Sequence, residues 1–233
     1  MRKPFTFWDF QCREFPYDLE RMCRHAVDRS CGQLVDINVE NFGTDELLRH
    51  IADSSSQPKR LRLVRCYDIS DEGLSEVAAK LSLLEELDIS YSLLSKEALE
   101  AVCRCCPHLK SLKFNNRWQK YRACDEEALV IAENLPELRR LQLFGNKLTN
   151  DGLQAILDGC PRLESLDLHQ CFNVTLTGNL GRRCAEQIKD LRRPHDSTID
   201  YEFDASFEFF SDDEDYYDDN DYEYFEAYDD PDY

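Results

Sequence analysis

The chain has 233 residues, of which 42% are hydrophobic, and a formal net charge of −19 at pH 7. The segment from Asp200 to Tyr233 holds 16 acidic residues and no Lys or Arg, so it carries most of that charge and the rest of the chain is nearly neutral. No run of 18 or more apolar residues occurs, so we expect no membrane-spanning helix.

The N-terminal residues and the cysteines point to an intracellular protein. Residues 1–11 are basic and then aromatic, without the continuous apolar stretch that a secretion signal has. The 11 cysteines are an odd number and lie at repeat positions, which favours reduced thiols over a disulfide framework. We therefore expect the protein in the cytoplasm, the nucleus or both.

A six-residue pattern of the form L-x-x-L-x-L recurs six times along the chain. Successive copies begin 24, 26, 25, 29 and 25 residues apart, within the leucine-rich-repeat period of about 20 to 29 residues. Each copy predicts a short strand with alternate side chains pointing inward, and stacked copies predict a parallel sheet. The copies are Leu34–Val39, Pro58–Leu63, Leu84–Ile89, Leu109–Phe114, Leu138–Leu143 and Leu163–Leu168.

Turn and helix signals follow most copies. Cys66, Asn146 and Cys171 stand three residues after the last apolar position, where a side chain can satisfy backbone groups as the chain leaves the strand. Hydroxyl residues then precede apolar runs with helical spacing, and early acidic residues suit the helix dipole. The expected helix starts are Thr44, Ser70, Ser95 and Thr149, and the expected ends are Cys106, Leu135 and Cys160, each before a proline.

These signals predict an α/β fold: a right-handed leucine-rich-repeat solenoid, a horseshoe like that of ribonuclease inhibitor, with about six repeats and a disordered acidic C-terminal tail. A helix near residues 19–27 is expected to cap the N-terminal end, and a charged helix around 180–191 the other end. The expected organisation is an N-terminal capping segment at 1–31, the repeat domain at 32–193 and the tail at 194–233.

The residues between and within the repeats resemble a known family. The C-P before a strand, the L-x-x-L-D-L and the S/T-D-x-G-L that opens a helix resemble the repeats of F-box/leucine-rich-repeat proteins. Four segments are similar to the small plant members in particular, and the resemblance covers about residues 5–200. These segments are Tyr17–Ser30, Ile51–Ser56, Leu141–Leu148 and Ile188–Pro194.

The resemblance implies a function in ubiquitin-dependent protein degradation. Family members use the repeats to recruit a substrate and a preceding F-box to bind the Skp-type adaptor of an SCF ubiquitin ligase. Here only Phe7–Phe10 resembles the segment that follows an F-box, so we expect adaptor binding only from a longer form that contains one. The alternative is a repeat adaptor or scaffold that has no link to ubiquitin.

Two columns of side chains are expected on the open face of the sheet. The first is Asn38, Arg62, Asp88, Lys113, Gln142 and Asp167, and the second is Glu40, Val64, Ser90, Asn115, Phe144 and His169. In one interpretation Arg62, Asp88 and Lys113 form a ladder of alternating charge that stabilises the sheet itself. In the other, the polar face forms a partner-binding groove, with Phe144 and His169 exposed near one end.

The fourth repeat is the longest, and its extra residues fall in Asn115–Arg122. Insertions in solenoids emerge as loops on one face, and Trp and Arg are common at the energetic centres of interfaces. Trp118 is therefore a further candidate for partner contact. The other interpretation is a loop in which Trp118 packs locally.

Catalytic and metal-binding sites are not expected. A zinc site requires four ligands, and Cys103 and Cys106 have no suitably spaced second pair, so we interpret them as buried thiols. Ser165, Asp167 and His169 lie on one open strand, which does not form the pocket that a catalytic triad requires. No phosphate-binding glycine motif occurs. We expect a protein that is not an enzyme and has no cofactor.

The acidic tail admits several roles. Residues 204–233 mix Asp and Glu with Phe and Tyr and have almost no aliphatic side chains, a composition typical of a disordered, solubilising segment. Alternatives are docking to a basic partner, histone chaperoning, folding back on the body, or phosphorylation at Ser211. The acidic charge disfavours nucleic acid, so the expected partner is a protein substrate of unknown identity, bound by a monomer.

Overall fold

The computed structural model describes residues 18–54, 58–115 and 123–202. The chain divides into two units, Met1–Asp196 and Ser197–Tyr233, and every helix and strand below belongs to the first. Three groups of predictions lie outside the described residues. They concern the aromatic segment Phe7–Phe10, the loop with Trp118, and the tail from residue 203 onward with Ser211.

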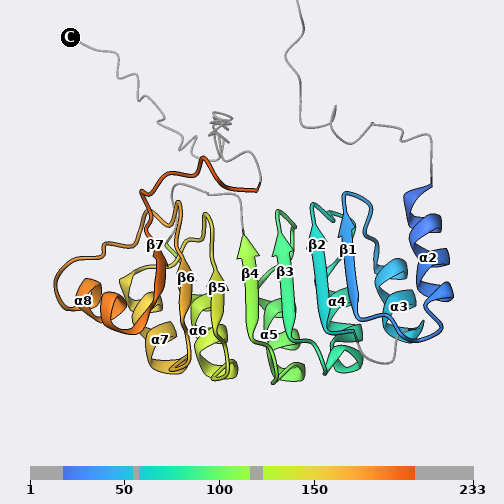
Figure 1. The fold of residues 1–233 in the computed structure, drawn as a ribbon, viewed down its shortest axis with the longest axis horizontal. Coiled ribbons are helices and arrows are strands. Elements are labelled where there is room, and N and C mark those ends of the chain that lie inside the picture. Colours follow the sequence, from blue (N-terminus) through green and yellow to red (C-terminus); the bar gives the residue numbers. More distant parts are fainter. Residues whose placement is uncertain (1–17, 55–57, 116–122, 203–233) are drawn as a thin grey trace, which may run out of the picture. The chain divides into compact units, whose positions relative to one another are not determined.

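The described residues of the first unit form a parallel sheet of seven strands that follow one another in chain order (Figure 1). The first six strands confirm the positions predicted from the repeated pattern, in register from one strand to the next. The strands are β1 (Asp36–Glu40), β2 (Arg60–Val64), β3 (Glu86–Ser90), β4 (Ser111–Asn115), β5 (Arg140–Gln142), β6 (Ser165–Asp167) and β7 (Asp190–Arg192).

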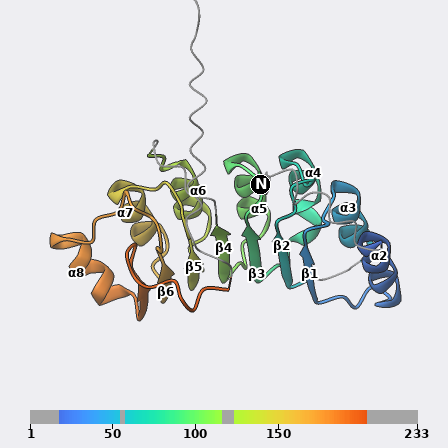
Figure 2. The ribbon, with the colours of Figure 1, turned by 90° about the horizontal axis from the view of Figure 1, so that it is seen from above.

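One layer of helices covers one side of this sheet, as the two ribbon views show (Figures 1 and 2). A helix follows each of the first six strands, and α2 precedes β1. None of the helices in the described ranges is long and apolar enough to cross a bilayer. The helices are α2 (Leu19–Arg29), α3 (Asp45–Ser54), α4 (Asp71–Ala78) with the 3-10 turn η1 (Ala79–Leu81), α5 (Lys96–Cys105), α6 (Glu126–Asn134), α7 (Asn150–Gly159) and α8 (Gly178–Gln187).

The C-terminal end of the sheet differs from the prediction. A helix was expected over residues 180–191, but α8 ends at Gln187 because Ile188 takes an extended conformation. The chain then forms β7, and Leu191 pairs with Leu166 as the next inner position of the sheet. The single apolar pair Ile188 and Leu191 was too short a signal to identify a strand from the sequence.

The inner strand positions and the helix stripes form one apolar core. On β2 and β3 the side chains of Leu61, Leu63, Leu87 and Ile89 are all at most 2% exposed. Burying a side chain of this size contributes about 1.5–3 kcal/mol. The repetition of such positions along the chain is what makes the pattern readable from the sequence alone.

The helix starts predicted at hydroxyl residues and the helix ends predicted before prolines are confirmed. Ser70, Ser95 and Thr149 are N-caps whose hydroxyls accept a hydrogen bond from an amide of the first turn, and Thr44 accepts one from the amide of Leu47 at 3.1 Å. The helices before the three prolines end as expected, with C-caps at Cys106, Leu135 and Cys160.

A carboxylate clamp joins successive helix starts. The Asp45 carboxylate accepts hydrogen bonds from the Ser70 amide (2.9 Å) and hydroxyl (2.7 Å), so that the first residue of α3 holds the cap of α4. The same pair of bonds runs from Ser95 to Asp71 and from Thr149 to Asp125. Each hydroxyl therefore caps its own helix and binds the helix before it.

Beside two of the three clamps stands the glycine of the S/T-D-x-G-L motif, while Ala98 occupies this position beside the clamp of Ser95 and Asp71. A Cβ on Gly73 would lie 1.9 Å from an Asp45 carboxylate oxygen, and a Cβ on Gly152 would lie 2.2 Å from one of Asp125. Glycine leaves the space in which the carboxylate of the preceding unit sits. The sequence shows the motif, but this reason for it is visible only when two units are stacked.

Candidate protein-binding surface

The middle column of the sheet face, the face opposite the helices, is a ladder of paired charges. Register places Arg62, Asp88 and Lys113 on adjacent strands. The Arg62 guanidinium lies 3.1 Å from the Asp88 carboxylate and the Lys113 ammonium lies 3.6 Å from it. The Asp88 side chain is 10% exposed and that of Lys113 is 39% exposed. The predicted pairing of alternating charges is present, and Lys113 is its most accessible member.

Two neighbouring columns repeat this arrangement. Arg60 and Arg140 both approach Glu86, at 3.5 and 3.1 Å. One residue earlier on each strand, Lys59 and Lys110 lie 3.1 and 2.7 Å from Glu85. Hydrogen bonds from Lys110 and then Lys59 lower the pKa of the Glu85 carboxyl to about 2. Solvent-exposed pairs of this kind contribute little to stability, so they can be rearranged at low cost.

The prediction that Phe144 and His169 are exposed is wrong. Phe144 is 3% and His169 1% exposed, and their ring centroids lie 6.2 Å apart. The prediction assumed that side chains keep alternating between the two faces as far as residues 144 and 169. The strands are shorter than that, because β5 ends at Gln142 and β6 ends at Asp167. Neither ring is accessible to a partner, because both lie buried beneath the surface.

The whole column that contains these rings is interior from β2 to β6, with Val64 and Ser90 at 0% exposure and Asn115 at 1%. Two of its polar members, Ser90 and Asn115, are hydrogen-bonded to each other. Ser90 donates to the carboxylate of Asp88, Asn115 donates to the Ser90 hydroxyl at 2.9 Å, and the amide of Phe144 donates to Asn115 Oδ1 at 3.0 Å. This chain connects Asp88 to the interior. Satisfied buried networks rigidify a core, and nothing in the sequence indicated that Ser90 and Asn115 belong to one.

Left-handed residues mark the strand exits along this edge. Arg65 (φ 52°) and Tyr91 (φ 56°) follow β2 and β3 directly. Their amides donate to the next strand, to Ser90 O at 2.9 Å and Asn115 O at 2.8 Å, which fixes the unusual conformation. The Arg65 guanidinium lies 5.9 Å from the centre of the Tyr91 ring, and Leu93 nearby in the chain is 75% exposed. The edge therefore presents aromatic, cationic and apolar groups together.

The remaining candidate residues have structural partners. The Ser165 hydroxyl donates to Asp190 at 3.1 Å, and Asp167 accepts the backbone amide of His169 at 3.0 Å. Neither contact joins Ser165 to the imidazole. Gln142 and Asn38 lie at their expected register positions beside Lys113 and Arg62.

The buried thiols are confirmed. Cys103 and Cys106 are 1% and 0% exposed, and the Cys106 thiol donates to Leu81 O at 3.2 Å. Burial raises the pKa of the Cys106 thiol to about 12. The repeat-position cysteines also bond backbone carbonyls as predicted, Cys66 to Val39 O at 3.4 Å and Cys171 to Leu143 O at 2.7 Å. Among residues 18–54, 58–115 and 123–202, no group of three or more His, Cys, Asp or Glu could hold a metal ion.

Comparison with known proteins identifies relatives of this chain. The family model described as the LRR repeats of FBD-associated F-box protein At5g56370 matches residues 118–181. F-box/LRR-repeat protein 23 of Arabidopsis thaliana is 55% identical, over 78% of this chain and 41% of the relative. F-box protein SKIP19 of the same plant is 51% identical, over 83% of this chain and 63% of the relative. The chain thus spans about two fifths and just under two thirds of these two relatives.

A third relative is matched over a larger share of its length. F-box/LRR-repeat protein 9 of Arabidopsis thaliana is 45% identical, over 72% of this chain and 68% of the relative. Among solved structures, the tropomodulin C-terminal domain of Caenorhabditis elegans aligns with a TM-score of 0.46 and 19% identity, over 61% of this chain and 92% of that one. The relatives confirm the resemblance seen in the sequence: the chain belongs to the F-box/leucine-rich-repeat proteins of plants.

Proposed function

We propose that this chain is a protein-interaction module, the substrate-recognition part of an SCF-type ubiquitin-ligase receptor that acts in protein degradation in the cytoplasm or nucleus. The observation that carries the proposal is the sheet face, an extended row of polar side chains held at fixed spacing by a regular parallel sheet. Membership of the F-box/leucine-rich-repeat family supports it. In this proposal the first unit is a right-handed leucine-rich-repeat solenoid of about six repeats. The protein is a monomer and has no catalytic activity.

The partner surface is centred on Lys113 and Arg62. Both cations lie beside the single carboxylate of Asp88, and Lys113 is its more distant and more exposed partner. Asp88 keeps the closer Arg62 guanidinium as its partner if Lys113 turns away, so an acidic group of a substrate can replace Asp88 as the partner of Lys113. Trp118, five residues after Lys113, lies outside the described residues and is proposed as a further contact from the sequence alone, because Trp is common at the energetic centres of interfaces.

The test compares Lys113→Ala with Arg49→Ala. The two side chains are equally exposed, at 39% and 38%, but Arg49 lies on α3 among the helices. Proteins that the tagged chain captures from plant cells should bind Lys113→Ala roughly tenfold more weakly, the effect of losing more than about 1 kcal/mol. They should bind Arg49→Ala normally. Equal capture by both variants would show that the sheet face does not bind the partner through Lys113.

The alternative, an adaptor without a link to ubiquitin, predicts a different fate for the captured proteins. Degradation substrates should accumulate ubiquitin-modified forms when the proteasome is inhibited, and they should do so less in cells that lack this protein. Partners of a simple adaptor should show neither change. A binding assay with a Skp-type adaptor is expected to be positive only for a form that includes an F-box.

A further inference from the structure

One residue at the exit of each strand has a left-handed backbone. It stands two positions after the last apolar residue of the repeated pattern, and the structure describes it in five of the six repeats. All five have a positive φ, so the conformation is a property of the stacked repeats and not of one loop. The residues are Asn41 (φ 70°), Arg65 (φ 52°), Tyr91 (φ 56°), Gly145 (φ 66°) and Gln170 (φ 60°).

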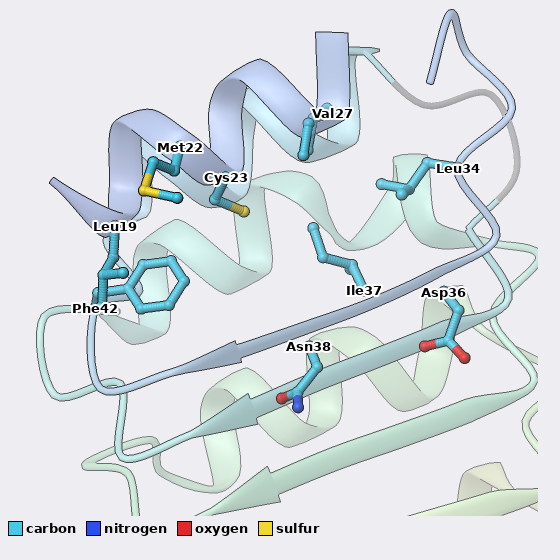
Figure 3. Close-up of a pocket in the computed structure, with 10 residues that line it drawn as sticks. Leu19, Met22, Cys23, Val27, Leu34, Asp36, Ile37, Asn38 and Phe42 are labelled. Carbon is cyan, nitrogen blue, oxygen red and sulfur yellow. The ribbon is translucent and has the colours of Figure 1, made fainter. Parts of the chain in front are cut away.

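The backbone of this residue explains the conformation. In all five cases its amide donates a hydrogen bond to a carbonyl of the next unit, at 2.8 to 3.0 Å. The turn also carries the following residue inward: Phe42 lines the same pocket as Leu19 of α2 (Figure 3), and Cys66 and Cys171 are buried. Both tasks belong to the backbone, so they place no demand on the side chain of the left-handed residue.

Arg65 and Tyr91 are unfavourable residues for such a position. A left-handed backbone is strained for a residue with a Cβ, whereas glycine adopts it freely and asparagine more often than most. The same chain uses Gly145 and Asn41 at two of the five positions. Backbone strain that the fold does not require is found at functional sites, where it is kept at the expense of stability. The side chains of Arg65 and Tyr91 therefore call for a functional explanation.

These two side chains lie together at the ends of β2 and β3. The Arg65 guanidinium is 5.9 Å from the centre of the Tyr91 ring, within the range of a cation–π contact. Its Nη1 atom is 3.7 Å from a Glu40 carboxylate oxygen, which is longer than a hydrogen bond. Because the Arg65 side chain is 36% exposed, the carboxylate of another molecule can approach it and form the shorter, paired bonds that guanidinium groups make.

Leu93, two residues after Tyr91, adds an apolar group to this pair. It is 75% exposed, more than any other large apolar side chain among the described residues of the first unit, whereas the adjacent Leu94 is 5% exposed. A single exposed leucine is ordinary, but this one stands beside Tyr and Arg, the residue types that are enriched at the energetic centres of interfaces. We call Arg65, Tyr91 and Leu93 the exit patch.

The charge around the exit patch favours an acidic partner. Residues 59–65, 85–91 and 110–115 contain β2, β3 and β4, and they hold six Lys or Arg and three Asp or Glu. Asp36 and Glu40 of β1 lie on one side, so the positive excess extends toward β4. It occurs in a chain whose net charge is −19. A local potential of the opposite sign attracts and orients a complementary partner.

We propose that the exit patch binds an acidic segment of the protein partner in which a large apolar side chain stands next to a carboxylate. The carboxylate pairs with Arg65, and the apolar side chain packs on Tyr91 and Leu93. This inference rests on the proposed function, because it extends the surface around Arg62 and Asp88 to the ends of their two strands. The left-handed strain at Arg65 and Tyr91 is then retained for binding.

Glycine variants of the full chain separate the structural role of these residues from the binding role. Tyr91→Gly and Arg65→Gly keep the backbone amide and remove the side chain, so their melting temperatures should be no lower than that of the wild type. The matched control is Gln170→Gly, at the same left-handed position after β6. A melting temperature that falls in Tyr91→Gly but not in Gln170→Gly would assign the Tyr91 side chain to the fold and overturn the proposal.

Binding is measured with a fluorescein-labelled synthetic peptide in which Asp and Leu alternate. Matched peptides replace every Asp with Asn or every Leu with Ala. Fluorescence anisotropy should show that the Asp-Leu peptide binds roughly tenfold more tightly than either. Tyr91→Gly, Arg65→Gly and Leu93→Asp should each weaken its binding by roughly tenfold, and Gln170→Gly should not. Equal affinity for the three peptides, or unchanged binding by Tyr91→Gly, would overturn the proposal.

Proteins captured from plant cells separate this inference from the proposed function. Capture that is lost in both Lys113→Ala and Tyr91→Gly, and kept in Gln170→Gly, supports both. Capture that is lost in Lys113→Ala but kept in Tyr91→Gly refutes the exit patch alone. Capture that is kept in Lys113→Ala removes the surface of the proposed function, and the exit patch, which extends that surface, is overturned with it.

Discussion

Removing the carboxylate of Asp45 should loosen the connection between α3 and α4. The carboxylate accepts two hydrogen bonds from Ser70, at 2.9 and 2.7 Å, while the Ser70 hydroxyl caps α4 through the Gly73 amide at 3.0 Å. Hydrogen bonds to charged groups contribute about 1.5–3 kcal/mol each, and half-exposed ones fall near the lower value. An acid in the first helical turn adds about 0.3–1 kcal/mol. We therefore expect Asp45→Ala to cost about 3–4 kcal/mol.

Urea unfolding followed by circular dichroism measures this cost as a lower midpoint at an unchanged slope. The control is Glu46→Ala, which removes the next acid of the same turn. Glu46 is 70% exposed and makes only a 3.6 Å ion pair with Arg49, so its loss should cost less than about 1 kcal/mol. The difference between the two variants isolates the clamp from the helix dipole.

A double-mutant cycle with Ser70→Ala provides the decisive comparison. If Asp45 and Ser70 act as one unit, the double variant should be less destabilised than the sum of the single variants, by at least about 1 kcal/mol. Effects that add to within about 0.5 kcal/mol would mean that the two residues act independently. That result would refute the clamp as a connection between repeats.

Three further variants test the packing and the buried groups. Gly159→Ala should cost about 1–3 kcal/mol in urea unfolding, because its Cβ would lie 2.1 Å from the backbone oxygen of Ala132; an unchanged midpoint would contradict the close approach of α6 and α7. Burial raises the pKa of Glu127, so its ionisation costs stability as the pH rises above about 4.3. Glu127→Gln, which can still accept the hydrogen bond from Asn146, should therefore melt above the wild type at pH 7 but not at pH 4. Burial raises the pKa of Cys66 to about 11, so iodoacetamide at pH 8 should leave Cys66 unmodified in the native protein by mass spectrometry, and rapid modification would contradict its burial.

The Cys66 thiol also predicts how the stability of the folded protein changes at alkaline pH. An unfolded cysteine ionises near pH 8.5, whereas the folded Cys66 keeps its proton up to about pH 11. Between these values the folded state binds the additional proton. This contribution to stability is complete below about pH 8.5 and is lost as the pH rises to about 11.

The parts of the fold that could be predicted from the sequence are those governed by local chemistry. The strands follow from inner positions such as Leu87 and Ile89, whose spacing has a single structural explanation once it recurs six times. The helix starts follow from hydroxyl residues such as Ser70, because an N-cap is satisfied within four residues of chain. The roles of Cys66 and Cys171 followed from their fixed position after the strand.

The parts that could not be predicted depend on contacts between units. Phe144 and His169 occupy positions that are outward by alternation, yet their column is interior because its members bind each other across strands. Asp45 is explained locally by the helix dipole, and only the stacked structure shows its bonds to Ser70. Periodicity within one repeat contains no information about either contact, since both partners belong to different repeats.

Surface ion pairs that are not connected to the buried networks can be changed to alter binding while the fold is kept. The ion pairs of Glu85 with Lys59 and Lys110 lie at the surface, and no buried network depends on them among the contacts that the structure describes. Reversing all three charges together, with the substitutions Glu85→Lys, Lys59→Glu and Lys110→Glu, retains both attractions and inverts the local potential. We expect this triple variant to keep the melting temperature of the wild type and to lose a partner that is recognised by charge at this site. Reversing Glu85 alone should lower the melting temperature, because it places three cations together. A triple variant that melts as low as the single one would show that the exact residues, and not the pairing of charges, hold this part of the sheet.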